Sequence, residues 1–182
     1  RPCPDRAVAE TFAGTDNPMI LLAVRIEAET GLRRAEIARI RRCDVEGDPG
    51  AFWLRVLGKG GHERTVPITD DLAAALIAGP GSYVFPSLDR WGNSLAPHIS
   101  ADALGVLIAE ALPDKWTVHT LRHRFATKAY AATKDIRAVQ ELLGHASPTT
   151  TAIYAQVANE SLRTAAMAAQ LDGIFADSPG AA

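Results

Sequence analysis

Apolar positions recur at helical spacing over most of the chain, and residues that favour helix ends separate the apolar segments. Asn17 followed by Pro18 predicts a helix start, and the apolar stretch 19–29 predicts a buried helix that ends at Gly31. Asp70 and Ser100 are the expected N-caps of helices that run to about residues 78 and 112. Further helices are expected over 6–12, 33–41, 119–132, 135–143, 148–157 and 160–175.

A shorter part of the chain has the composition of β-strands. The segments 51–57 and 64–68 are rich in aromatic and β-branched residues, and Gly58-Lys59-Gly60-Gly61 between them predicts a hairpin turn. Val45 is a candidate start of a third strand, and residues 79–98, with their Gly, Pro and Ser, are expected to form a loop. The pattern predicts a mainly α domain with a small antiparallel β-sheet, of the α+β class, over 1–176, and a disordered tail over 177–182.

Composition places the chain among ordinary globular domains, because 47% of its 182 residues are apolar and 22% are charged. No apolar run approaches the roughly 20 residues that a membrane-spanning helix needs. The net charge of −2 argues mildly against a nucleic-acid partner, but the cations are clustered along the sequence, and the local field matters more to a ligand than net charge. Taken alone, a cluster of charged residues is usually a solvated face of the protein.

Several kinds of chemistry lack their usual sequence signals. The chain has no GxxxxGK[ST] loop for phosphates, no HExxH motif and no zinc-binding Cys/His pattern. Cys3 and Cys43 do not suggest a disulfide scaffold, so a reducing, cytoplasmic environment is expected. The sequence therefore shows no equipment for a nucleotide-driven or metal-dependent enzyme, and no cofactor is expected.

Five short motifs do carry a signal, and they follow one another in a fixed order. They are TGLRxxEI from Thr30 to Ile37, GKGxxxR from Gly58 to Arg64, HxLRHxFAT from His119 to Thr127, LLGH from Leu142 to His145, and TTxxY from Thr150 to Tyr154. The first is moderately specific and the second is weak. The third, followed by LLGH and a tyrosine, is strong, and the five together make coincidence improbable.

The ordered motifs resemble the tyrosine recombinase (phage integrase) family, and the resemblance covers about residues 18–160. It implies the catalytic-domain fold of that family, with cleavage and rejoining of DNA through a 3′-phosphotyrosyl bond. It also implies a catalytic set with Tyr154 as the nucleophile, composed of Arg33, Glu36, Lys59, His119, Arg122, His145 and Tyr154. Cys43 stands where the family often has Trp, which touches packing rather than chemistry. The helical DNA-clamping domain that usually precedes this domain is not expected within this chain.

Elementary chemistry explains this inventory independently. Attack on a phosphodiester builds negative charge on its non-bridging oxygens, and the planar fork of arginine suits paired contacts to such oxygens. Tyr154 must lose its proton as it attacks, and His119 is the candidate base. The departing 5′-oxygen needs a proton, which Lys59 could supply from the tip of its hairpin.

Each of these residues also has an ordinary structural explanation. Tyr154 could be a packing residue, His145 a helix-end partner, Glu36 an ordinary helix acid, Arg33 a partner of a helix carboxylate and Lys59 a solvated turn residue, but these explanations must all hold together to displace the functional one. Five further cations could either contact the DNA backbone or simply be solvated, and this choice stays open for Arg34, His62, Arg64, His123 and Arg124.

The resemblance also implies partners. They are double-stranded DNA recombination sites and further copies of the enzyme in a tetramer on DNA, in the cytoplasm of a bacterial host and associated with its nucleoid, without a membrane. The apolar stripe of the helix over 160–175 fits docking onto a neighbouring copy and packing on its own domain. Two other functions remain open, a DNA-binding module that has lost catalysis and a type IB topoisomerase.

Overall fold

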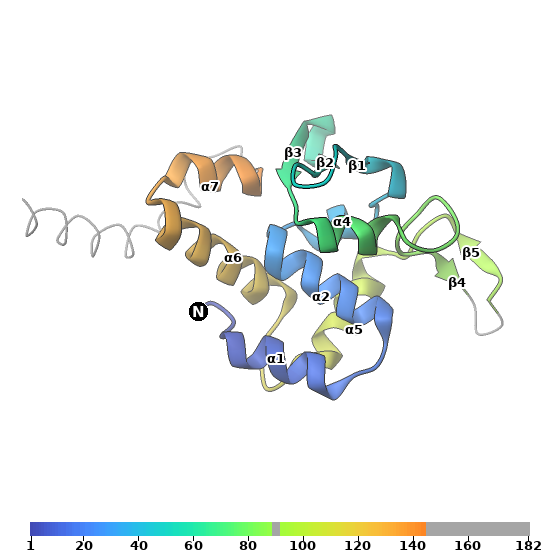
Figure 1. Cartoon of the computed structure of the whole chain (residues 1–182). Helices are drawn as coiled ribbons and strands as arrows, with labels where there is room; N and C mark the ends of the chain where they lie inside the picture. Colours follow the sequence, from blue (N-terminus) through green and yellow to red (C-terminus); the bar gives the residue numbers. More distant parts are fainter. Residues whose placement is uncertain (89–91, 145–182) are drawn as a thin grey trace, which may run out of the picture. The chain divides into compact units, whose positions relative to one another are not determined.

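The computed structural model describes residues 1–88 and 92–144 and consists there of helices and two small antiparallel sheets (Figure 1). This architecture confirms the expected fold class. The α-helices are α1 (Asp5–Gly14), α2 (Pro18–Thr30), α3 (Arg34–Ile37), α4 (Asp70–Ile77), α5 (Ala101–Ala111), α6 (Val118–Thr133) and α7 (Ile136–Leu143), and the 3₁₀-helices are η1 (Arg42–Asp44) and η2 (Lys59–Gly61). The strands are β1 (Val45–Glu46), β2 (Trp53–Leu57), β3 (Glu63–Pro67), β4 (Ser87–Leu88) and β5 (Ser94–Ala96). The helices expected over 148–157 and 160–175, and the tail over 177–182, lie outside the described residues.

Helix α2 begins and ends at the residues that the sequence predicts. The Asn17 side chain accepts hydrogen bonds from the backbone N–H groups of Met19 and Ile20, at 3.0 and 3.4 Å. These bonds satisfy donors that the first turn of a helix leaves without partners. At the other end Gly31 adopts a left-handed conformation, with φ of 64°, and its N–H donates to the carbonyl of Glu27. The chain then turns sharply into the TGLR motif.

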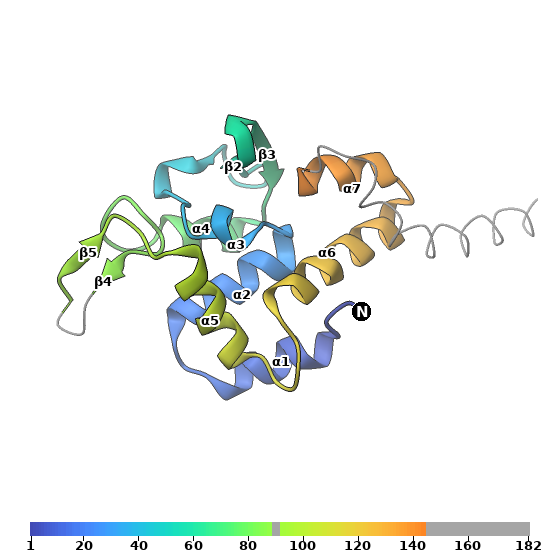
Figure 2. The same cartoon turned by 180° about the vertical axis from the view of Figure 1, so that it is seen from behind.

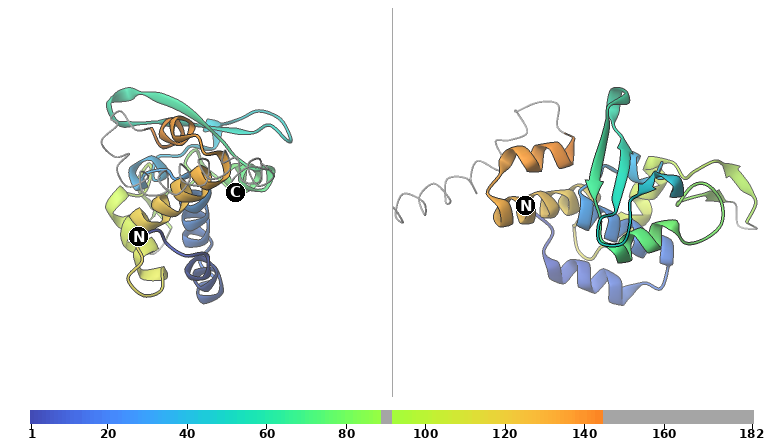
Figure 3. Two further views of the ribbon diagram at one scale, coloured as in Figure 1. Left: turned by 90° about the vertical axis from the view of Figure 1, so that its left-hand side faces the viewer. Right: turned by 45° about the horizontal axis from the view of Figure 1, so that its top comes forward.

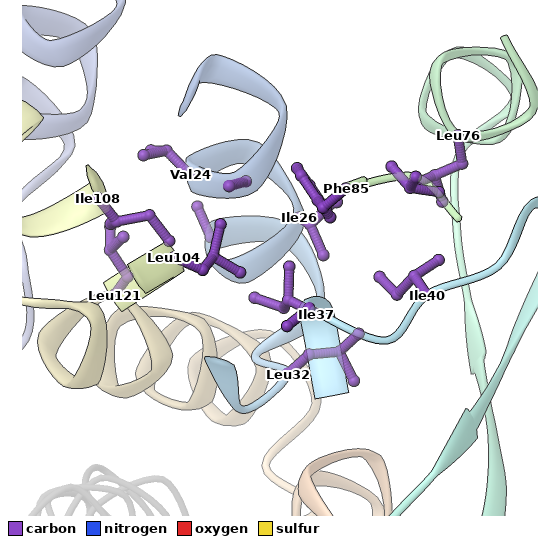
Figure 4. Packing of buried hydrophobic residues seen from close by; sticks show 14 of the residues in the cluster. Val24, Ile26, Leu32, Ile37, Ile40, Leu76, Phe85, Leu104, Ile108 and Leu121 are labelled. Carbon is purple, nitrogen blue, oxygen red and sulfur yellow. The ribbon is translucent and has the colours of Figure 1, made fainter. Parts of the chain in front are cut away.

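The core lies where the other helices pack around α2. Helices α1, α3, α5 and α6 all contact α2, and the views from both sides show it among them (Figures 1 and 2). The core side chains drawn in Figure 4 come from several elements and point toward one another between them. Those that are fully buried include Ile26, Leu32, Ile37, Leu76, Phe85, Leu104, Ile108 and Leu121. This packing fixes α3, which carries Glu36, and α6, which carries His119 and Arg122.

The larger sheet has three strands and lies beside the helices. Its strand order is β1-β2-β3, all antiparallel, and Leu54 of β2 pairs with Val66 of β3. Both of these side chains are buried, whereas their neighbours along each strand are more exposed, as expected for a sheet with one covered face. The β2–β3 hairpin extends away from the helices in Figure 3, and β3 packs against α7. The turn η2 therefore lies at the tip of a projecting hairpin.

The prediction of a helix over 33–41 is wrong in its extent, because α3 ends at Ile37. The chain turns through Ala38 and Arg39, and Arg41 then pairs with Tyr83 in an isolated β-bridge. The Asp44 carboxylate accepts the backbone N–H of Arg41 at 2.9 Å and starts the 3₁₀-helix η1. Ile37 and Ile40, whose spacing suggested a continuous helix, are both buried in the core, but in different local structures.

Two further expectations are corrected. Thr69, not Asp70, caps α4, because the Thr69 hydroxyl accepts the N–H of Leu72 at 3.3 Å. The Asp70 carboxylate instead accepts the N–H of Gly50, at 2.8 and 3.0 Å. The segment 79–98 is not only a loop, since it contains the paired strands β4 and β5. Strands of two and three residues are too short to show an alternating pattern in the sequence.

Gly31 generates a prediction about stability. A Cβ at this position would lie 2.3 Å from a ring carbon of Phe125 and 2.9 Å from a methyl carbon of Leu143, and the φ is positive. We expect Gly31→Ala to lower the free energy of unfolding by roughly 2–5 kcal/mol, because backbone strain and overpacking add. Urea unfolding followed by circular dichroism measures this change.

Gly14→Ala is the matched control, since a Cβ at Gly14 meets nothing within 4 Å and its φ is ordinary. This substitution should leave stability unchanged or raise it by up to about 1 kcal/mol. Equal stability of the Gly31 and Gly14 variants would mean that the contacts at Gly31 are not a constraint on the fold.

Candidate active site

The C-terminal end of α7 is where the catalytic-site candidates converge. Its last carbonyl groups accept hydrogen bonds from three arginines on three different segments. Arg64 of β3 donates to Leu142 at 2.9 Å, Arg122 of α6 donates to Leu143 at 2.8 Å, and Arg33, just before α3, donates to Gly144 at 3.2 Å. A helix leaves these carbonyls without internal partners and carries partial negative charge at this end, so the cations satisfy both needs.

Glu36 joins two of these arginines. Its carboxylate accepts both terminal nitrogens of Arg64 at 2.9 Å, as well as the Arg33 backbone N–H at 2.8 Å and the Arg33 guanidinium at 3.0 Å. Burial pushes the Glu36 pKa upward, but the hydrogen bonds and charges of Arg64 and Arg33 outweigh it, so the pKa lies below its ordinary value. Glu36 is therefore a buried anion that holds the two guanidinium groups in place.

Arg33 and Arg122, the two predicted catalytic arginines, are brought side by side. They donate to the adjacent carbonyls of Gly144 and Leu143, and Arg122 also donates to the carbonyl of Gly31. The Arg122 residue is 8% exposed, whereas the Arg33 side chain is 40% exposed. Backbone carbonyls carry no net charge, so these particular bonds orient the guanidinium groups without neutralising them. This pair can present two planar cations to an anion.

His119 lies one turn before Arg122 on α6, as the motif predicts, and it is exposed. Its ring meets the ring of His123 edge to face, with the ring centroids 4.4 Å apart. Burial, helped by the positive charges of His119 and Arg122, lowers the pKa of His123. His119 is thus on the same helix and the same face as Arg122, and His123 adjoins it.

The remaining members of the predicted catalytic set are placed only in part. Lys59 belongs to the turn η2 at the hairpin tip, directly after Gly58. A Cβ on Gly58 would lie 3.5 Å from Nη1 of Arg64 and 3.7 Å from Oε1 of Glu36. The backbone that leads to Lys59 therefore adjoins the arginine cluster. His145 and Tyr154 lie outside the described residues.

The five ambiguous cations occupy different surroundings. Arg64 is bound inside the cluster, and its side chain is only 11% exposed, so holding Glu36 accounts for this residue. Arg124 pairs with Asp5 and donates to the carbonyl of Ala28. It follows Arg122 by two residues and so projects from another side of α6. Arg34 pairs with the exposed Asp102, and His62 is exposed beside the hairpin turn.

The buried acid Glu27, near Arg122, was not among the site residues predicted from the sequence. Glu27 of α2 is 1% exposed, and Arg122 and Arg34 are the charges that act on it. The available signal was a carboxylate within the apolar stretch 19–29, which was predicted to be a buried helix. Within the described part of the chain, no helix is long and apolar enough to cross a membrane, and no three His, Cys, Asp or Glu residues are grouped to hold a metal ion.

Glu36 generates a prediction about pH. Its pKa is lower in the folded protein, so its stabilising contribution is present above the ordinary value near 4.3 and is lost as pH falls through the folded value. We expect Glu36→Gln to reduce the free energy of unfolding by about 3 kcal/mol at pH 7, because the change breaks a buried ion pair. The difference from the parent should shrink as the pH is lowered toward 3.

Chemical denaturation at several pH values measures both effects. Glu29→Gln is the control, because Glu29 pairs with Arg25 at the surface of α2. That change should cost at most about 0.5 kcal/mol. If the difference between Glu36→Gln and the parent did not depend on pH, the stabilising role assigned to the ionised carboxylate would be wrong.

Comparison with known proteins agrees with this geometry. Residues 7–161 match the phage integrase family. The tyrosine recombinase XerC of Rhodospirillum centenum is 41% identical over 140 residues, which cover 72% of this chain and 40% of that protein. The chain spans about half the length of the curated relatives it matches.

Solved structures share the fold. The integrase from mycobacterium phage Brujita superimposes with a TM-score of 0.67 at 30% identity, over 83% of this chain and 51% of that chain. A lambda integrase tetramer bound to a Holliday junction gives a TM-score of 0.57 at 21% identity, over 81% and 47% of the two chains. The sequence match covers most of the chain and includes all five motifs, and the fold agrees with it. The chain therefore belongs to the phage integrase family.

Proposed function

We propose that this chain is the catalytic domain of a site-specific tyrosine recombinase, which cleaves and rejoins DNA strands. The observation that carries the proposal is the placement of Arg33 and Arg122. These residues come from motifs far apart in the sequence, yet they donate to adjacent carbonyls at the end of α7. Two fixed guanidinium groups side by side suit the non-bridging oxygens of one phosphate.

The reaction begins with attack of the Tyr154 hydroxyl oxygen on the DNA phosphorus. A bond forms between phosphorus and the tyrosine oxygen, and the bond from phosphorus to the 5′-oxygen breaks, which leaves a 3′-phosphotyrosyl link. His119 accepts the tyrosine proton, and Lys59 donates a proton to the departing 5′-oxygen. A 5′-hydroxyl of another strand then displaces Tyr154, so rejoining needs no nucleotide.

Arg33, Arg122 and His145 stabilise the negative charge that builds on the phosphate oxygens. Glu36 supports Arg33 through the bonds described above and does not itself contact the phosphate. The exposed side chain of Arg33 and the adjoining His119–His123 pair support an approach of DNA from this side of α6.

The partners follow from the same proposal. Duplex recombination sites are the substrate, and the protein works as a tetramer on DNA in the bacterial cytoplasm, at the nucleoid. The lambda integrase structure contains a tetramer on a Holliday junction, and we extend this assembly to the protein that contains this chain. The segment over 160–175 is the candidate for docking onto a neighbouring copy, and Arg34, His62 and His123 are candidate contacts to the DNA backbone.

Trapping the covalent intermediate tests the function directly. The chain is incubated with a pool of short duplexes that are randomised in sequence and carry a nick near the centre. After cleavage the short strand beside the nick diffuses away, so the protein stays attached and migrates as an adduct on a denaturing gel. Tyr154→Phe should abolish the adduct, while binding of duplex DNA persists because no phosphate contact is removed.

Tyr83→Phe is the matched control and should form the adduct at the yield of the parent. An adduct of normal yield from Tyr154→Phe would contradict the assignment of the nucleophile. DNA binding without any adduct from the parent would favour a module without catalysis. Relaxation of a plain supercoiled plasmid by the monomer would favour a topoisomerase.

The role of Lys59 has its own test. Lys59→Ala should slow cleavage of ordinary DNA on the order of a hundredfold or more, as expected for loss of a general acid. The variant should recover on DNA that has sulfur in place of the bridging 5′-oxygen, because a thiolate leaves without protonation. Cleavage rates of both substrates by the parent and the variant are compared.

Arg33→Ala provides the control for this experiment, since loss of charge stabilisation at the non-bridging oxygens should not be rescued by sulfur. Equal defects of Lys59→Ala on both substrates would remove the general-acid role. The covalent mechanism through Tyr154 would not be affected by that outcome.

A further inference from the structure

A buried acid lies beneath the proposed phosphate site and has no place in the mechanism above. Glu27 of α2 is 1% exposed, which is unusual for a carboxyl group. Among the residues that the structure describes, its Oε2 atom is buried and has no hydrogen-bond partner. The backbone carbonyl of Glu27 accepts a hydrogen bond from the N–H of Gly31. The carbonyl of Gly31 in turn accepts a hydrogen bond from the guanidinium group of Arg122. Glu27 is therefore one helical turn from the residue that anchors a catalytic arginine.

Two cations act electrostatically on the Glu27 carboxyl group. Arg122 acts on it from α6 and Arg34 acts on it from α3, and of the described residues on α1 and α5, the other helices against α2, none adds a charge. Burial raises the pKa of Glu27 well above its ordinary value, and the two arginines oppose this shift only in part. The carboxyl group therefore stays protonated to a higher pH than an exposed glutamate would.

The protonation state of Glu27 decides how much positive charge Arg122 can offer to a ligand. The carbonyls of Gly31 and Leu143 orient Arg122 but bring no full charge. A protonated Glu27 adds no negative charge beside Arg122. An ionised Glu27 would neutralise much of the positive charge of Arg122 from within the protein, because Coulomb interactions are strong where water is excluded. A bound phosphate and an ionised Glu27 thus compete for the same cation.

We propose that Glu27 is a positioning residue that acts through Arg122 and couples the binding of a DNA phosphate to the uptake of a proton. The proposal rests on the proposed function, because it takes Arg122 to be a phosphate contact. The protonated acid accompanies the DNA-bound state, and the ionised acid accompanies the empty site at high pH. DNA binding should therefore weaken as pH rises through the titration of Glu27.

The first measurement follows the Glu27 carboxyl carbon by NMR in the DNA-free chain that carries ¹³C-labelled glutamate. Its titration should lie well above the ordinary range of a glutamate carboxyl group. Arg122→Gln should move the titration of Glu27 further upward, because the change removes a neighbouring positive charge. Addition of a 20-base-pair duplex of arbitrary sequence should move it upward as well.

The second measurement is the affinity for that duplex between pH 5 and 9 at fixed salt. If binding takes up one proton, the affinity for the duplex falls by up to about tenfold for each pH unit above the pH at which Glu27 titrates. Glu27→Gln and Glu27→Leu should lose this part of the slope, whereas Glu29→Gln should keep it. Both histidines near Arg122 on α6 are present in all four proteins, so the difference between the variants isolates Glu27.

The results separate this proposal from the proposed function. If the parent forms the Tyr154 adduct but Glu27→Gln keeps the full pH slope, the coupling is wrong and the recombinase function stands. If Glu27→Gln loses this part of the pH dependence of binding and the parent forms no adduct, the coupling stands and the cleavage mechanism is wrong. If the parent binds no duplex and forms no adduct, both fall together. Should Glu27→Gln fail to fold, the carboxyl titration of the parent with and without duplex decides, and an unmoved titration overturns the coupling.

Discussion

The arrangement of the site depends on how the end of α7 is capped. Arg33, Arg64 and Arg122 reach the last carbonyls of this helix from three separate segments. The bonds tie β3, α3 and α6 to one point, so the predicted catalytic residues on these segments share one frame. A helix end would otherwise have carbonyl groups without protein partners, and satisfying them with arginines concentrates positive charge at this point.

Local signals in the sequence predicted the parts of the fold that local chemistry determines. Asn17, Gly31, Ser100 and Gly144 end or begin helices as expected, because a cap acts on atoms only a few residues away. The hairpin around Gly58-Lys59-Gly60-Gly61 was predictable for the same reason. Arg33 and Arg122 could be paired from sequence only through the ordered motifs and their resemblance to a family, since spacing alone says nothing about residues so far apart.

Long-range contacts account for what could not be predicted. Glu36 looked like either an ordinary helix acid or a support for the site, and only the approach of β3 shows that Arg64 pairs with it. Thr69 caps α4 because Asp70 is drawn to the N–H of Gly50, twenty residues away in the sequence. Helix α3 ends at Ile37, and four residues later Arg41 pairs with Tyr83 across the fold. In each case the structure depends on contacts between residues far apart in the sequence, which local sequence signals do not report.

The chain has a net charge of −2, yet arginines gather at its candidate site. Backbone carbonyls explain how this cluster of cations can form in a chain that is acidic as a whole. A cation held only by carboxylates would be neutralised before any phosphate arrived. Here the carbonyls at the end of α7 and at Gly31 share in holding the guanidinium groups, and they supply dipoles without net charge. Glu36 accepts from both Arg33 and Arg64, so one carboxylate pairs with two cations in this cluster. The acidic groups elsewhere set the net charge of the protein, while the field that a DNA phosphate would meet is set by this local balance.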